Sequence, residues 1–158
     1  MDKNSAIINY ILQCPQIINS PLYFNFIDAK DNTTQIITSS NDRYTEKPYI
    51  TGSVEKLFTF TMVIFKSITE DAIVKLEGFA HENVEELAYI QELIDWIVEQ
   101  NELHNYPDFG TDCDVISIKT TEENPRLVGI NTDTTPALAM YNVTIQIEYI
   151  DNSKNIWR

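Results

Sequence analysis

Hydrophobic residues recur at helical spacing in two segments of the chain. The first segment runs from Asn4 to Leu12 and is ended by Pro15. Asn4 or Ser5 can cap its start. The second segment is longer and runs from Glu82 to Glu99. Each pattern predicts an amphipathic helix. The apolar stripe of the longer helix consists of Leu87, Ile90, Ile94, Ile97 and Val98, with Val84 and Leu93 at its edges.

Two shorter segments between Pro15 and Ser39 have the composition of β-strands. Leu22 to Ala29 and Gln35 to Thr38 are rich in aromatic and β-branched residues. Asp31 and Asn32 lie between the two segments and favour a turn. The pattern therefore predicts a β-hairpin.

The segment Val54 to Ile68 predicts a long strand, because its side chains alternate between two faces. One face carries Phe58, Phe60, Met62 and Ile64, and the other carries Thr59, Thr61, Val63 and Phe65. The first face is apolar and should be buried. The second is half apolar, so a helix or another subunit could cover it.

Two further strands are predicted at Cys113 to Lys119 and at Ala137 to Ile150, where the alternation is regular. The polar segment from Thr120 to Thr135 carries turn signals. The predicted order is thus a helix, three strands, a long helix and two strands. This order favours an α+β fold in a single domain over residues 1–158. We expect a mixed, mainly antiparallel sheet flanked by the N-terminal helix and one long central helix.

Two segments are predicted to be exposed. Residues 39–48 form a polar stretch with charges of both signs, which predicts a long loop. A loop of this length in a small domain usually has a function. Residues 151–158 are predicted to form an extended C-terminal tail. Ile156 and Trp157 within it are costly to expose, so we expect them to dock on something.

The net charge of −13, from 11 basic and 24 acidic residues, limits the partners of the chain. It argues against classical nucleic-acid binding and against adhesion to an anionic membrane surface. No apolar run approaches the ~20 residues of a membrane span, and the N-terminus lacks the pattern of a signal peptide. A cytosolic protein is expected, in which Cys14 and Cys113 are reduced unless they meet in space.

The sequence contains no motif for catalysis, for a cofactor or for a metal centre. His81 and His104 lie about 23 residues apart, near opposite ends of the longer helix, too far apart to share a site. Asp108, Asp112 and Asp114 form a local acidic cluster. Such a cluster fits either a weak calcium site or a turn capped by carboxylates. We therefore predict no catalytic residue, no cofactor and no metal, and a protein that is not an enzyme.

Several stretches of the chain resemble the tail terminator, or tail-completion, proteins of long-tailed bacteriophages. The closest group comes from phages and prophages of Gram-positive hosts and is often labelled minor capsid protein. The resemblance rests on the overall pattern and includes no catalytic motif. The matching stretches are Pro21–Phe26, Tyr49–Ser53, Phe58–Phe60, Glu85–Trp96, Tyr106–Gly110, Pro136–Tyr141 and Ile147–Tyr149.

The resemblance implies a structural virion protein that assembles in the cytoplasm of a host bacterium and is located in the tail or neck. In this family a sheet flanked by helices forms a hexameric ring. The ring caps the tail tube, ends its growth and presents a surface for the head–tail connector. In contractile tails, related rings also anchor the sheath. Six copies at −13 carry 6 × −13 = −78 charges, which would let DNA slide through the lumen without specific binding. No membrane partner is implied.

The resemblance also suggests roles for particular residues. Ile7, Ile8 and Ile11 of the first helix, with the Val54–Ile68 strand, are expected to contribute to core and subunit packing. The 41–48 loop is predicted to contact the tail tube, and the C-terminal pair is predicted to dock on a neighbouring subunit. The candidate interface residues are Asn41, Asp42, Arg43, Tyr44, Glu46, Lys47, Ile156 and Trp157.

Two alternatives to a terminator remain open at this point. The first is another piece of the same machine, either a head–tail stopper or a tail-tube subunit. A tube subunit should polymerise into long tubes, whereas a terminator should stop at one ring. The second is a small-ligand binder or an enzyme on an unrelated α+β scaffold. That class would require a deep pocket with convergent polar groups.

Overall fold

The computed structural model describes residues 2–17, 21–25, 33–38, 46–68, 76–122, 124–131, 133 and 137–157. The side chains of α3 are described from Val84 onward. The elements in chain order are α1 (Lys3–Ile11), β1 (Leu22–Phe24), β2 (Thr33–Thr38), β3 (Lys47–Pro48), β4 (Val54–Ile68), α3 (Leu76–Glu102), β5 (Cys113–Thr120), β6 (Leu127–Asn131) and β7 (Ala137–Asp151).

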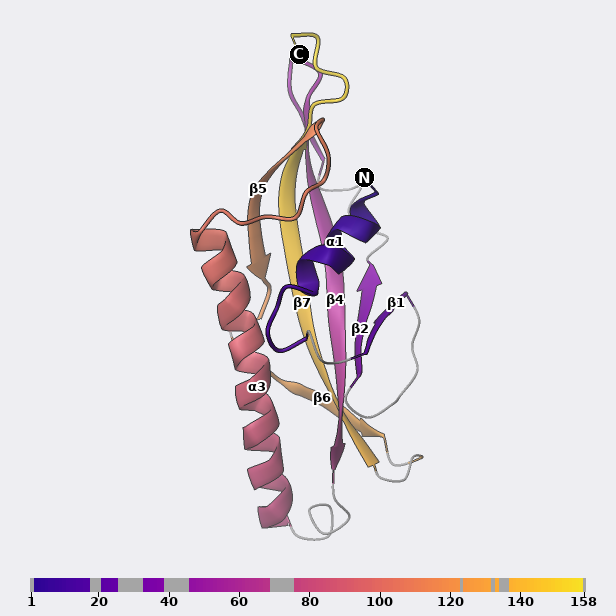
Figure 1. Ribbon diagram of the computed structural model, residues 1–158, viewed down its shortest axis with the longest axis vertical. Coiled ribbons are helices and arrows are strands. Elements are labelled where there is room, and N and C mark those ends of the chain that lie inside the picture. Colours follow the sequence, from indigo (N-terminus) through magenta and orange to yellow (C-terminus); the bar gives the residue numbers. More distant parts are fainter. Residues whose placement is uncertain are drawn as a thin grey trace.

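Two long strands, β4 and β7, form the centre of the sheet (Figure 1). Each has 15 residues, and the two pair antiparallel along their whole length, from Val54 opposite Asp151 to Ile68 opposite Ala137. The strand order is β1-β2-β4-β7-β5, with β3 paired to β4 and β6 paired to β7. This register places the beginning of β4 and the end of β7 at the same end of the molecule.

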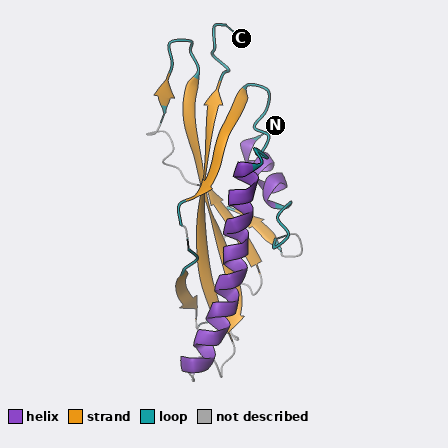
Figure 2. Cartoon of the chain, turned by 90° about the vertical axis from the view of Figure 1, so that its left-hand side faces the viewer, coloured by secondary structure: helices purple, strands orange, loops and turns teal. Residues whose placement is uncertain are grey.

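Both described helices, α1 and α3, lie on the same face of the sheet (Figure 2). The main core lies between them and that face. It contains Ile7 and Ile11 of α1, Phe60 and Met62 of β4, and Ile97 of α3, together with the inward residues of β7. The predicted α+β fold, with a mainly antiparallel sheet flanked by an N-terminal helix and a long central helix, is therefore confirmed.

The predicted hairpin of the first two strands is wrong, because β1 and β2 run parallel, with Leu22 opposite Thr34. At the end of β1, Asn25 adopts a positive φ of 50°. Its N–H donates to the carbonyl of Ile36 at 2.7 Å, and its Oδ1 accepts from the N–H of Thr38 at 3.0 Å. Asn25 thus ends β1 against β2, and the chain returns to begin β2 beside the start of β1. The predicted turn at residues 31–32 lies outside the described residues.

Other boundaries also differ from the prediction. Asp2 caps α1, accepting from the N–H of Asn4 at 3.4 Å, so neither Asn4 nor Ser5 is the N-cap residue. The helix α3 extends beyond the predicted range at both ends. The segment predicted as loop between Thr120 and Thr135 contains the strand β6, which has five residues and a register shift beside Gly129. A strand this short gives little alternation from which to predict it.

The buried side of α3 is rotated relative to the predicted stripe. Leu93, predicted at the edge, is fully buried together with Ile90 and Ile97. Val98, predicted within the stripe, is 47% exposed, and Val84 is 64% exposed. Successive helical residues differ by about 100°, so a helix that buries Ile97 turns Val98 away from the core.

Tyr10 connects α1 to the end of α3. The ring is buried and packs on Trp96 with their centroids 5.4 Å apart. The hydroxyl donates to the carbonyl oxygen of Asn105 at 2.8 Å. Burial raises the pKa of Tyr10 well above its usual value, with a smaller contribution from Tyr106. The side chain therefore stays neutral and joins α1 to the loop after α3.

We expect Tyr10→Phe to lower the free energy of unfolding by about 1 kcal/mol, because one part-buried hydrogen bond is lost while the ring packing is retained. Urea unfolding followed by circular dichroism measures the change. Tyr49→Phe is the matched control, since it removes the exposed hydrogen bond from Tyr49 to Glu55. A larger loss in the control than in Tyr10→Phe would contradict the role of Tyr10.

Candidate interaction site

One end of the molecule is built from two chain segments that meet in space (Figure 1). We call this end the tip and define it as residues 49–53 and 152–157. The first segment is the turn between β3 and β4. It is closed by a hydrogen bond in which the N–H of Tyr49 donates to the carbonyl oxygen of Ser53 at 2.8 Å. The second follows β7, and the N–H of Ile156 donates to the carbonyl of Thr51 at 2.9 Å. The tip thus depends on the residues before β4 and after β7, which meet at one end of the central strand pair.

A cluster of short polar side chains holds the two segments of the tip together. Ser53 donates from Oγ to Oδ1 of Asn152 at 2.6 Å and accepts from Nδ2 of Asn155 at 2.9 Å. Asn152 also donates from Nδ2 to Asp114 at 2.7 Å. Ser53 and Asn152 are buried. Buried polar groups whose hydrogen bonds are satisfied fix a single arrangement, so the C-terminal segment is not the extended tail that was predicted.

An ion pair lies directly below the tip. Lys56 Nζ lies 2.8 Å from Asp151 Oδ2, and both side chains are partly buried. The hydrogen bond to Lys56, with further bonds to Ser153, holds the pKa of Asp151 well below its usual range. The bond to Asp151 raises the pKa of Lys56. The pKa of the acid is lowered and the pKa of the base is raised, so both shifts show that the pair stabilises the charged form of each group.

These shifts predict a pH-dependent contribution to stability. The folded-state pKa of Asp151 is depressed from 3.8, so the stabilisation is present above about pH 4 and is lost as the pH falls further. The folded-state pKa of Lys56 is raised from 10.5, so its part is lost only in strong alkali. We expect the unfolding free energies of wild type and Lys56→Met to differ at neutral pH and to converge in acid.

Urea titrations between about pH 2 and pH 8 measure this difference. Lys119→Met is the control, because Lys119 forms a more exposed pair with Glu148 at 3.2 Å. Exposed pairs contribute little, so the control should show a small difference at every pH. A Lys56→Met difference that stayed constant with pH would contradict the assignment.

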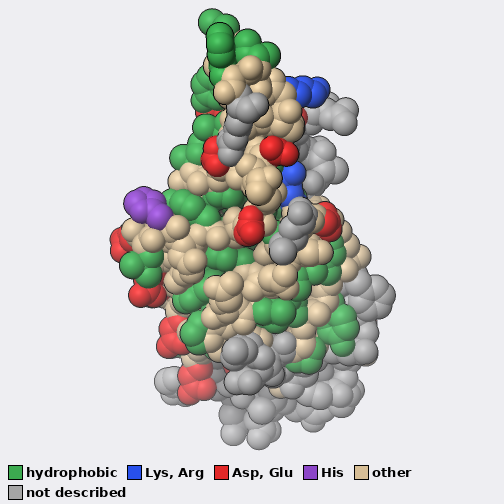
Figure 3. All heavy atoms as spheres, turned by 45° about the horizontal axis from the view of Figure 1, so that its top comes forward, with side chains coloured by type: hydrophobic (Ala, Val, Ile, Leu, Met, Phe, Trp, Pro, Cys, Tyr) green, Lys and Arg blue, Asp and Glu red, His purple; other side chains and the backbone are tan. Residues whose placement is uncertain are grey.

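The tip presents large apolar side chains to solvent. Ile50 is fully exposed, Trp157 is 81% exposed, Ile156 is 71% exposed and Tyr49 is 48% exposed. Figure 3 shows hydrophobic side chains gathered at this end of the molecule. The backbone that carries them is held in place, since the N–H of Trp157 donates to Oδ1 of Asn155 at 2.8 Å. Apolar groups clustered on an ordered surface are typical of a protein–protein contact.

The tip contains some of the predicted interface residues. Ile156 and Trp157 belong to it, and their side chains remain exposed while their backbone contacts the β3–β4 turn. Glu46 and Lys47 lie beside it and are exposed, although Lys47 and Pro48 form β3 and are not part of a loop. The predicted residues Asn41, Asp42, Arg43 and Tyr44 lie outside the described residues.

Two further residues of the tip, Tyr49 and Ile50, were not predicted as interface residues. A local signal for them exists, because two large apolar residues between Pro48 and Gly52 occupy a tight turn, where polar residues are usual. The proximity of this turn to the C-terminal segment has no local signal, since it depends on the pairing of β4 with β7.

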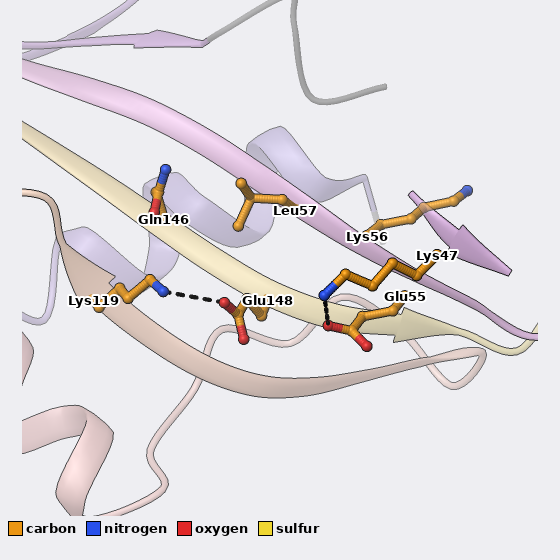
Figure 4. Close-up of a pocket in the computed structure, with 7 residues that line it drawn as sticks. All are labelled: Lys47, Glu55, Lys56, Leu57, Lys119, Gln146 and Glu148. Carbon is orange, nitrogen blue, oxygen red and sulfur yellow. Dashed lines mark hydrogen bonds and ion pairs between the residues drawn. The ribbon is translucent and has the colours of Figure 1, made fainter. Parts of the chain in front are cut away.

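The face of the sheet opposite the helices carries a shallow depression (Figure 4). It is lined by Lys47, Glu55, Lys56, Leu57, Lys119, Gln146 and Glu148. Its charges are all paired: Lys119 lies 3.2 Å from Glu148, Lys47 lies 3.7 Å from Glu55, and Lys56 pairs with Asp151 outside the depression. Charges that pair along the surface do not converge on a bound molecule, so this depression does not favour a small-ligand site.

The acidic cluster near Asp108 has local structural partners. Asp108 accepts from the N–H of Gly110 at 2.9 Å, and Asp114 accepts from Asn152. Among the residues that the structure describes, no group of three His, Cys, Asp or Glu side chains is placed to hold a metal ion. Cys14 and Cys113 are free thiols. Within the same residues, no helix is long and apolar enough to cross a membrane.

No protein-family model matches the chain, and no curated protein matches it. The fold class is therefore defined by the structure alone, as an α+β protein with both described helices on one face of its sheet.

Proposed function

We propose that the protein is a structural subunit of a bacteriophage tail, or of a phage-like particle. In this role it is a tail terminator that forms a ring, caps the tail tube and joins it to the head connector. The observation that carries the proposal is the tip, where a buried polar cluster supports four large exposed apolar side chains. The resemblance in sequence to tail terminators specifies the kind of assembly.

The tip favours assembly over binding of a small molecule because of its shape and order. Small-molecule sites are concave and enclose most of the ligand. The tip is convex, and its apolar side chains are exposed to solvent, Ile50 and Trp157 the most. Hot spots in protein interfaces are enriched in Trp and Tyr, which add contact area at a low cost in side-chain entropy.

The charge distribution fits a ring through which DNA passes. The α3 helix contains eight acidic residues and no Lys or Arg: Glu77, Glu82, Glu85, Glu86, Glu92, Asp95, Glu99 and Glu102. Where such a surface lines a lumen, it repels the phosphate backbone, and the nucleic acid does not adhere to the wall.

The state of assembly in solution tests the proposal. We expect light scattering on a size-exclusion column to give six times the 18.2 kDa of one chain, and negative-stain images of the same peak to show rings. Long tubes would instead assign the protein as a tail-tube subunit. A chain that stays monomeric, both alone and with purified tails that lack a terminator, would contradict the proposal.

A further inference from the structure

Asn152 follows the last residue of β7, and each of its four polar atoms takes part in a hydrogen bond. Its main-chain N–H donates to the carbonyl oxygen of Asp112 at 2.7 Å, and its main-chain carbonyl accepts from the N–H of Asn155 at 2.9 Å. Its side chain accepts from Oγ of Ser53 at 2.6 Å and donates from Nδ2 to Oδ2 of Asp114 at 2.7 Å. Asn152 is only 8% exposed, so these bonds form in a largely dry environment.

The position of Asn152 explains why one residue can reach three segments of the chain. Strands β4, β5 and β7 meet below the tip (Figure 1). Asp151, the last residue of β7, pairs with Val54 of β4 on one side and with Cys113 of β5 on the other. Asn152 is therefore the first residue beyond this three-stranded ladder. Its bonds fix the path of the chain from the end of β7 into the segment that carries the exposed Trp157.

We propose that Asn152 is the positioning residue of the tip, and that it holds Ile156 and Trp157 in one arrangement before a partner binds. The inference rests on the proposed function, in which the tip contacts another protein subunit. Asn152 is buried, so it acts through the backbone of residues 153–157 and does not touch the partner itself. A segment that is already ordered loses less conformational entropy on association, and the contact is correspondingly tighter.

The chemistry of this position requires an amide side chain. Oδ1 of Asn152 faces a donor, the hydroxyl of Ser53, while Nδ2 faces an acceptor, the carboxylate of Asp114. Aspartate has nearly the same shape, but its ionised carboxylate offers acceptors only. Asn152→Asp would keep an acceptor for Ser53 and would place a second negative charge at hydrogen-bond distance from Asp114. The two carboxylates repel one another, so the C-terminal segment should detach from the start of β5.

Exchanging the two side chains tests the contact. Asn152→Asp should lower the protection of the amides of residues 155–157 against hydrogen exchange by about tenfold. Asp114→Asn alone should change it little, because an amide oxygen can still accept from Nδ2 of Asn152. The double variant, Asn152→Asp with Asp114→Asn, should regain the protection, because donor and acceptor have changed places. A general loss of stability would not be recovered by this particular second change.

Asn124→Asp is the matched control, because it adds the same charge at an exposed position outside the tip. It should leave the protection of residues 155–157 unchanged. Circular dichroism checks that each variant keeps its fold. Light scattering over a range of protein concentrations gives the assembly readout. The concentration needed to form rings should rise about tenfold in Asn152→Asp and return to that of wild type in the double variant.

The possible results separate the role of Asn152 from the proposed function. Amides that stay protected in Asn152→Asp, or that stay unprotected in the double variant, would overturn the positioning role. Lost protection with unchanged ring formation would overturn the link between an ordered tip and assembly. A wild-type chain that remains monomeric with and without purified tails would contradict the proposed function, and the exchange measurements would then decide the positioning role on their own.

Discussion

Replacing Gly52 with alanine is expected to release the C-terminal segment from the β3–β4 turn. Gly52 has a φ of +91°, and a Cβ placed on it would lie 2.2 Å from the carbonyl oxygen of Lys154. That oxygen belongs to the backbone and cannot move away as the end of a long side chain could. The backbone strain alone costs roughly 1–3 kcal/mol, and the close contact adds to it. The two segments of the tip must therefore separate or shift.

Gly129→Ala provides a matched control, because a Cβ at Gly129 would meet nothing within 4 Å. Alanine at that position should leave the stability within about 0.5 kcal/mol of wild type or raise it slightly. Urea unfolding measures the global effect of each variant. Hydrogen exchange of the amides of Asn155, Ile156 and Trp157, whose N–H groups bond within the tip, measures the local one. Unchanged protection of these amides in Gly52→Ala would disprove the role given to Gly52.

The second large effect is expected at Ile97, which is fully buried against the sheet. Ile97→Ala should lower the free energy of unfolding by about 2–5 kcal/mol, because it removes buried methyl groups and leaves a cavity. That amount is a large part of the roughly 5–15 kcal/mol that stabilises a typical domain. Thermal and urea unfolding of the purified variant would measure the loss.

The neighbouring residue Val98 is the control for Ile97. It is 47% exposed, so Val98→Ala should change stability by no more than about 0.5 kcal/mol. If the two variants lost equal stability, the described orientation of α3 would be wrong.

The sequence was most informative where the local pattern is long and regular. The bounds of β4 were predicted to the residue, and those of β7 to within one residue, because each alternates over 15 positions. The direction of β1 relative to β2 was missed, because composition predicts a strand but not which way the chain returns. Pairing partners are set by tertiary contacts, which a single sequence does not encode locally.

The candidate site was predicted only in part for the same reason. One half of the tip was predicted, because Ile156 and Trp157 are large apolar residues whose exposure to water is unfavourable. The other half is joined to it by the hydrogen bond from Asn155 to Ser53, across a sequence separation of 102 residues. On α3, Ile90, Ile94 and Ile97 of the predicted stripe are buried, and Val98 was included wrongly, because it has the hydrophobicity of a core residue but is 47% exposed.

Because β4 and β7 pair along their full length, the tip can become ordered only after this pairing is complete. Ser53 and Asn152 are 99 residues apart in the chain, and they meet only beyond the last pair of the ladder, Val54 with Asp151. Contacts this distant in sequence are costly in loop-closure entropy until the intervening structure has formed. A copy with an incomplete ladder would therefore lack an ordered tip. Competence to assemble would then be limited to copies whose sheet has closed, and misfolded copies would be kept out of the assembly.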